Sequence, residues 1–208
     1  TNTGIAKTLE AVQQVCGADV DATFIQGNHD AAGSNCAPTG PCDKADFGMF
    51  TIMEEDYRSY PQDSGKWSDP QNSEAKAQAV ADKLDAYLAE KTAAGFDKPV
   101  FIACHVPIHY NTRTKNKADA IYGDVIYKTL YKYGDDLNII FLYGHNHAWG
   151  DDDYLGGAAN FLTRGDTINI AKHGSRDEFT VEPLNFTYMN YGYTGYHWAQ
   201  RGSSRRQG

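Results

Sequence analysis

Apolar residues recur at helical spacing in three stretches of the chain. In residues 5–16 they fall three or four positions apart, the spacing that puts side chains on one face of an α-helix. The same spacing predicts a helix of about twenty residues that starts near Glu74 and ends at Gly95. It also predicts a second long helix over residues 118–133. All three stretches are therefore predicted to be amphipathic helices.

Strands are predicted before, between and after these helices. Residues 22–25 form a short apolar run, and residues 100–104 and 139–143 are apolar without alternation. Continuous apolar runs of this length are typical of strands buried on both faces. After Trp149 the pattern changes to short runs separated by Gly, Asn and Asp, which predicts antiparallel strands and hairpins. These later runs are residues 167–171, 179–181 and 184–189.

The order of helices and buried strands predicts an α/β fold. No internal repeat or linker divides the chain, so residues 1–200 are predicted to be a single domain, followed by a disordered basic tail at 201–208. Residues 31–72 are rich in Gly, Pro, Ser, Asn and Asp, which predicts a long irregular insertion. Loops of this length in compact domains are usually functional.

Charge and composition argue against several classes of protein. The 208 residues include 19 Lys and Arg against 27 Asp and Glu, which gives a net charge of −8. This balance argues against nucleic acid as a partner, and so against a nuclease, because no basic stripe is present. No apolar run approaches the ~20 residues of a membrane helix, so no membrane span is expected. The sequence does not predict an oligomeric state.

Three polar clusters follow the three predicted strands. They are Gly-Asn-His-Asp at residues 27–30, His-Val-Pro-Ile-His at residues 105–109 and Gly-His-Asn-His at residues 144–147. Ligand sites of α/β folds lie at the carboxyl ends of strands, so the clusters are predicted to converge. They contain five of the seven histidines, and imidazole and amide groups suit Zn, Fe or Mn ions. An acidic chain that handles phosphate would also need metal ions to reverse the local field.

In this order, the clusters resemble the later motifs of the calcineurin-like metallophosphoesterase superfamily, which read G-N-H-[D/E], a lone His, and G-H-x-H. The resemblance covers roughly residues 20–150. The His-x-Pro form around His105, and the aromatic residue soon after residues 144–147, look most like the purple acid phosphatase side of that family. The resemblance implies an α/β fold layered as an α-β-β-α sandwich, with two mixed sheets flanked by helices. It also implies hydrolysis of phosphate monoesters or diesters, either small molecules or groups on a polymer.

The resemblance further implies a site with two divalent or trivalent ions, either Mn, Zn or Fe. One ion would be bound by Asn28, His105 and His145, and the other by His147. His29 would assist the leaving group, and Asp30 would hold the His29 ring in the useful tautomer. His109 and Arg113 are predicted to contact substrate. The alternatives are a packed or exposed histidine for His109, and a solvated loop for Arg113.

The start of the chain departs from the family pattern. That pattern begins with D-x-H and G-D-x-x-[D/N], and the 26 residues before Gly27 contain neither motif. The first ion thereby loses two ligands, and both ions lose a bridging carboxylate. We therefore expect that the N-terminal βαβ portion of the domain is missing and that the chain binds fewer than two ions. A binding module without catalysis is the alternative, although a pure scaffold has no need of His29 and Asp30.

Cysteine spacing bears on the compartment of the protein. Cys36 and Cys42 flank a Pro/Gly loop and are predicted to form a small disulfide, which favours a secreted or extracytoplasmic protein. The alternative is two loop thiols. Cys16 and Cys104 lie in apolar stretches and are predicted to be small core residues. The run Asn185-Phe-Thr187 is a glycosylation sequon, meaningful if the source is a secreted eukaryotic protein.

Overall fold

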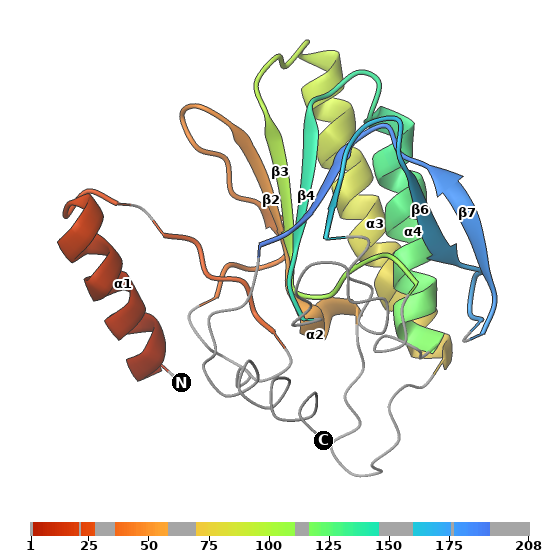
Figure 1. The fold of residues 1–208 in the computed structure, drawn as a ribbon, viewed down its shortest axis with the longest axis horizontal. Helices are drawn as coiled ribbons and strands as arrows, with labels where there is room; N and C mark the ends of the chain where they lie inside the picture. The colour runs from red at the N-terminus through yellow and green to blue at the C-terminus, as the bar shows by residue number, and fades with distance from the viewer. Residues whose placement is uncertain are drawn as a thin grey trace, which may run out of the picture.

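The computed structural model describes residues 2–20, 22–27, 36–57, 70–110, 117–145, 160–175 and 177–191. These residues form an α/β fold (Figure 1). Its elements are α1 (Asn2–Cys16), β1 (Gly40–Pro41), β2 (Gly48–Ile52), α2 (Glu54–Tyr57), α3 (Pro70–Ala93), β3 (Val100–Cys104), α4 (Lys117–Tyr133), β4 (Ile139–Tyr143), β5 (Phe161–Leu162), β6 (Thr167–Ala171), β7 (Phe179–Pro183) and β8 (Thr187–Asn190).

The main sheet of the described residues has six strands in the order β1-β2-β3-β4-β8-β5. Its four inner strands are parallel, and the short edge strands β1 and β5 are antiparallel to their neighbours. Phe50, Ile102, Phe141 and Tyr188 stand in register across the inner strands. All four side chains are fully buried, so this row forms the centre of the core. A strand with neighbours on both sides and buried faces must be apolar throughout, as the sequence of β3 is.

Helices α3 and α4 lie together against one face of the sheet (Figure 1). Leu84 and Leu88 of α3, with Ile126 and Leu130 of α4, are fully buried and are spaced four residues apart on each helix. α3 connects β2 to β3 and α4 connects β3 to β4, which is the kind of crossover that parallel neighbours require. Strands β6 and β7 form a separate antiparallel hairpin, and β6 packs against α4.

Most of the predicted elements are confirmed. The helices predicted from Glu74 and over residues 118–133 are α3 and α4, and Gly95 follows α3 in the left-handed region at φ 61°. The buried strands predicted at 100–104 and 139–143 are β3 and β4. The later runs form β6, β7 and β8.

Three predictions are wrong. Residues 22–25 form no strand, because the main-chain contact there is a single hydrogen bond from Ala37 N–H to Phe24 O rather than a ladder. Residues 31–72 are not an irregular insertion throughout, since they contain β1, β2 and α2. The run that forms β8 is not only an antiparallel strand. β8 pairs in parallel with β4 on one side and in antiparallel fashion with β5 on the other.

Helix α1 is confirmed, yet it stands apart from the sheet (Figure 1). Val12 is 37% exposed and Val15 is 85% exposed. Cys16, predicted to be a core residue, is exposed, whereas Cys104 is fully buried as predicted. The apolar spacing in α1 therefore forms a helix without bringing its apolar face into the core.

Two close approaches of backbone hold α4 in place. A Cβ atom on Gly123 would lie 2.5 Å from the carbonyl oxygen of Ile108, in the loop after β3. A Cβ on Gly134, just after α4, would lie 2.2 Å from Oδ1 of Asn185. Asn185 is 7% exposed, and its Nδ2 donates to the carbonyl oxygen of Tyr131 over 2.9 Å. The chain therefore has no room for a side chain at two points, within α4 at Gly123 and just after its last residue at Gly134.

Two remaining expectations concern cysteines and membranes. The predicted bridge between Cys36 and Cys42 is not formed, and both residues are half-buried thiols. Among the helices in the described ranges, none is both long and apolar enough to span a bilayer.

Replacing Gly123 with alanine should destabilise the fold although alanine favours helices. Because the added methyl group meets a carbonyl oxygen of the main chain, we expect a loss of about 1–3 kcal/mol in the free energy of unfolding. Helix propensity alone would predict a gain of about 1 kcal/mol. Urea unfolding of the two proteins measures the difference, and a gain in stability would contradict the observed packing.

Candidate functional site

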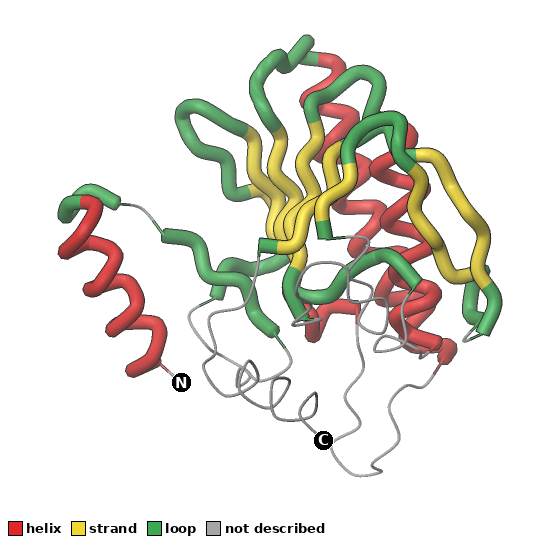
Figure 2. The backbone as a smooth tube through the Cα atoms, viewed as in Figure 1, coloured by secondary structure: helices red, strands yellow, loops and turns green. Residues whose placement is uncertain are grey.

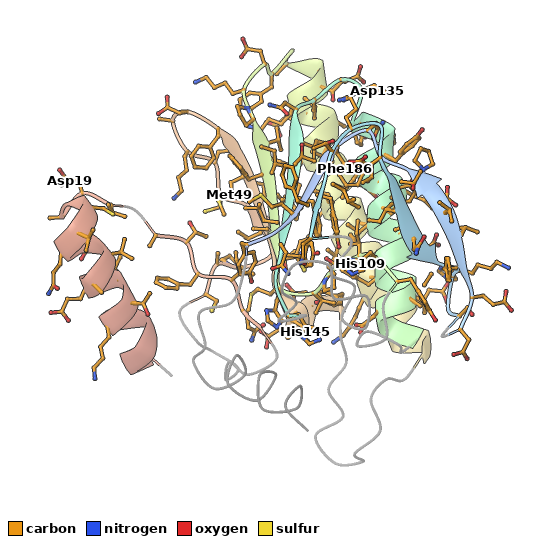
Figure 3. The ribbon with its side chains drawn as sticks, viewed as in Figure 1. Asp19, Met49, His109, Asp135, His145 and Phe186 are labelled. Carbon is orange, nitrogen blue, oxygen red and sulfur yellow. The ribbon has the colours of Figure 1, made fainter. Side chains whose placement is uncertain are left out.

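The carboxyl ends of β3 and β4 meet at one edge of the sheet, where the two described histidine clusters begin. His105 follows β3 directly, and His145 follows Gly144 at the end of β4. The N–H of Gly144 donates to the carbonyl oxygen of His105 over 3.0 Å, which continues the parallel pairing past both strands. The parallel strands are drawn in yellow in Figure 2. His145 and Asp135, labelled in Figure 3, lie at opposite ends of them.

The rings of His105 and His145 face each other. Nδ1 of His145 lies 3.1 Å from Nε2 of His105, with the ring centroids 5.0 Å apart and the ring planes at 80°. The side chain of His105 is 18% exposed, so the pair is partly shielded from solvent. Two imidazole nitrogens at this separation suit either a hydrogen bond between the rings or a shared metal ion.

His145 reaches this position through an unusual backbone conformation. Its φ is +65°, and among the described residues other than glycine it alone has a positive φ. The left-handed region costs an L-residue roughly 1–2 kcal/mol, and such strain concentrates at functional sites. A Cβ on the preceding residue, Gly144, would come within 2.8 Å of the Tyr191 hydroxyl, so a side chain at that position would clash with Tyr191.

Gly27, the first residue of the predicted Gly-Asn-His-Asp cluster, packs against His105. A Cβ atom at this position would lie 2.8 Å from Nδ1 and Cε1 of the His105 ring. The absence of a side chain therefore allows the start of the first cluster to touch the second, as the sequence predicted. The preceding Gln26 is buried, and its Nε2 donates to Oε2 of Glu55 over 3.0 Å.

Glu54 also lies at this edge, and the sequence analysis did not single it out. It begins α2 just after β2, it is 1% exposed, and its Oε2 lies 3.9 Å from Nε2 of His105. The available signal was an acidic run, residues 54–56, directly after an apolar run. This signal is weak because the Gly, Pro, Ser, Asn and Asp content of residues 31–72 predicts an irregular segment there.

His109, which is labelled in Figure 3, lies in the core beside two tyrosines. It is 3% exposed, and its ring meets those of Tyr143 and Tyr188 edge to face. The Tyr188 hydroxyl accepts the N–H of Ile108 over 3.0 Å and lies 2.8 Å from Nδ1 of His109. Its own hydrogen can then be donated to Nδ1, which puts the proton of the neutral ring on Nε2. Burial lowers the pKa of His109 to about 3, so the ring is neutral at pH 7.

The predicted site residues thus fall into two groups. His105 and His145 are brought together, whereas His109 is packed in the core behind them. The other predicted residues, Asn28, His29, Asp30, Arg113 and His147, lie outside the described residues. Within the described ranges, no three His, Cys, Asp or Glu side chains form a group that could hold a metal ion.

Comparisons with models of known protein families, with curated proteins and with solved structures found no match for this chain.

Substitution of His145 tests the strained turn independently of metal. Without a Cβ, glycine adopts φ near +65° at little cost, so His145→Gly should be more stable than His145→Ala by about 1 kcal/mol. The free energy of unfolding is measured in urea with a chelator present. Asn138, an exposed loop residue with ordinary φ, is the matched control, and there alanine should be the more stable. Equal stability of the two His145 variants would contradict the strain.

The buried His109 should make the protein less stable in mild acid. Because its folded pKa of about 3 is below the unfolded value of about 6.5, the unfolded chain takes up the proton first as the pH falls. His109 should therefore lower the free energy of unfolding by about 2–3 kcal/mol between pH 7 and pH 4.5. Urea unfolding at both pH values, compared with His109→Gln, isolates this contribution. A glutamine variant with the same pH dependence would contradict it.

Proposed function

We propose that this protein is a metal-dependent phosphoesterase, with His105 and His145 among its metal ligands. The observation that carries the proposal is the 3.1 Å separation of the two ring nitrogens at the ends of parallel strands. Nitrogens bound to one ion at about 2.0–2.1 Å would lie about 2.9 Å apart at 90° and about 3.4 Å apart at the tetrahedral angle. The observed distance falls between these values, so the separation of the two nitrogens is compatible with their binding one ion.

The remaining roles follow the resemblance of the three clusters to the calcineurin-like metallophosphoesterases. Asn28 would join His105 and His145 at one ion, and His147 would bind the other. When bound, the ions would supply an activated water and offset the charge of the phosphoryl oxygens. His29 would donate a proton to the leaving oxygen, and Asp30 would hold its ring in the tautomer that allows this.

The proposal extends to the fold, the substrate and the compartment. It includes the layered α-β-β-α sandwich of two mixed sheets, of which the six-stranded sheet with α3 and α4 would form one half. The substrate would be a phosphate monoester or diester. A secreted or extracytoplasmic protein remains our proposal for its compartment.

A binding module without catalysis is the second candidate, and one observation favours it. The distance of 3.1 Å is also that of an ordinary hydrogen bond between Nδ1 of His145 and Nε2 of His105, if one ring donates and the other accepts. In that case the two rings would pin the ends of β3 and β4 together and would need no metal.

Metal content and activity, measured together, distinguish the two candidates. The purified chain is loaded with Mn²⁺ or Zn²⁺, and bound metal is counted by elemental mass spectrometry. Hydrolysis is followed with p-nitrophenyl phosphate and bis(p-nitrophenyl) phosphate. His145→Ala should lower metal content and turnover together. His29→Ala should leave metal content intact and lower turnover by about 10²- to 10⁴-fold.

The variants also show which part of the proposal fails. Metal content unchanged by His145→Ala would favour the hydrogen-bonded pair and the binding module. Turnover unchanged by His29→Ala would leave a metal site but remove the role proposed for His29.

A further inference from the structure

Glu54 reaches the histidine pair through the register of the sheet. Strand β2 pairs in parallel with β3, with Ile52 opposite Cys104. Glu54 is two residues beyond Ile52 and His105 is one residue beyond Cys104, so the sheet brings both residues to the same edge. Helix α2 lies at this end of the strands (Figure 1).

The carboxylate of Glu54 is removed from solvent and directed toward the pair. The residue is 1% exposed, and Oε2 lies 3.9 Å from Nε2 of His105. That nitrogen is the one that faces Nδ1 of His145 at 3.1 Å. An oxygen from α2 and two nitrogens from the loops after β3 and β4 thus converge on a small region.

Burial of a charged carboxylate has two effects, on the stability of the fold and on the groups around it. A charge held away from water acts more strongly on its neighbours than one on the surface, and it destabilises the fold unless positive charge compensates it. The adjacent Glu55 is only half-buried, and it accepts a hydrogen bond from Gln26. A cation at the histidine pair would lie close enough to this buried carboxylate of Glu54 to interact with it strongly.

We propose that Glu54 is a positioning residue of the cation site, whose negative charge draws a divalent ion to His105 and His145 without binding it directly. The 3.9 Å separation suits this indirect role, and the role rests on the function proposed above. Glu54 differs from a carboxylate that accepts from the outer ring nitrogen of a metal-bound histidine, because it faces the nitrogen that would bind the ion and so acts through its charge.

Binding of Co²⁺ to the full chain tests this role without any assay of activity. The d–d absorption of Co²⁺ reports its ligands, and titration gives the dissociation constant. Glu54→Gln keeps the shape of the side chain and removes its charge, so the dissociation constant should rise about 10- to 100-fold. Asp56→Asn, which removes a charge two residues along the same helix, is the matched control and should change it by less than about threefold, because partly exposed charges are screened.

A second pair of variants separates charge from shape. Glu54→Asp keeps the charge and should bind Co²⁺ more tightly than Glu54→Asn, and this pair gives the same test if Glu54→Gln does not fold. Each variant is checked for cooperative unfolding, and the rise in midpoint temperature on addition of Co²⁺ is the second readout. Equal loss of affinity in the aspartate and asparagine variants would overturn the role of the charge.

Failure of this inference is distinguishable from failure of the proposed function. If His145→Ala weakens Co²⁺ binding while Glu54→Gln leaves it unchanged, the role of Glu54 is overturned and the metal site remains. If His145→Ala leaves Co²⁺ binding unchanged, or the unsubstituted chain binds none, both proposals are overturned. In that case Glu54 is better described as an ion-pair partner of His105.

Discussion

The main-chain hydrogen bond from Gly144 N–H to His105 O is the contact on which the candidate site depends. It extends the parallel register of β3 and β4 one step beyond the strands, so the two histidines leave the sheet side by side. Parallel strands place their carboxyl ends at one edge, and crossover helices are needed to return the chain each time. The positions of α3 and α4, and the adjacent positions of His105 and His145, are therefore consequences of one topology.

The core is tied to this edge through hydroxyl groups of buried tyrosines. Tyr188 is part of the buried row across the sheet, yet its hydroxyl accepts the N–H of Ile108 and contacts His109. The Tyr122 hydroxyl similarly donates to Sγ of Cys104 over 2.9 Å, at the last residue of β3. Burial of a hydroxyl group without such a partner would cost free energy. The partners of these two hydroxyl groups lie on both sides of His105 in the sequence. The loop that carries His105 is thereby held by the same side chains that fill the interior.

The sequence predicted β3, β4, α3 and α4 from two patterns. Uninterrupted short apolar runs indicate buried strands, and apolar residues at helical spacing indicate amphipathic helices. It placed His105 and His145 together by the same reasoning. It missed β2 because Gly48 and the surrounding Gly, Pro and Asp residues resemble a loop, although β2 pairs with β3 along its whole length. With β2 unrecognised, nothing in the sequence could connect Glu54 to His105. The parallel pairing of β8 with β4 was equally out of reach, since it depends on where the chain returns and not on local pattern.

Because Asn185 is buried, the glycosylation sequon Asn185-Phe-Thr187 is inaccessible in the folded protein. A glycan attaches through Nδ2, which here donates to the carbonyl oxygen of Tyr131. Oδ1 packs so closely against Gly134 that no side chain would fit there. An oligosaccharide on this nitrogen would separate the end of α4 from the segment that enters β8. A glycan at Asn185 is therefore incompatible with the contact between this residue and the end of α4, so the sequon can be modified only where that contact is not formed.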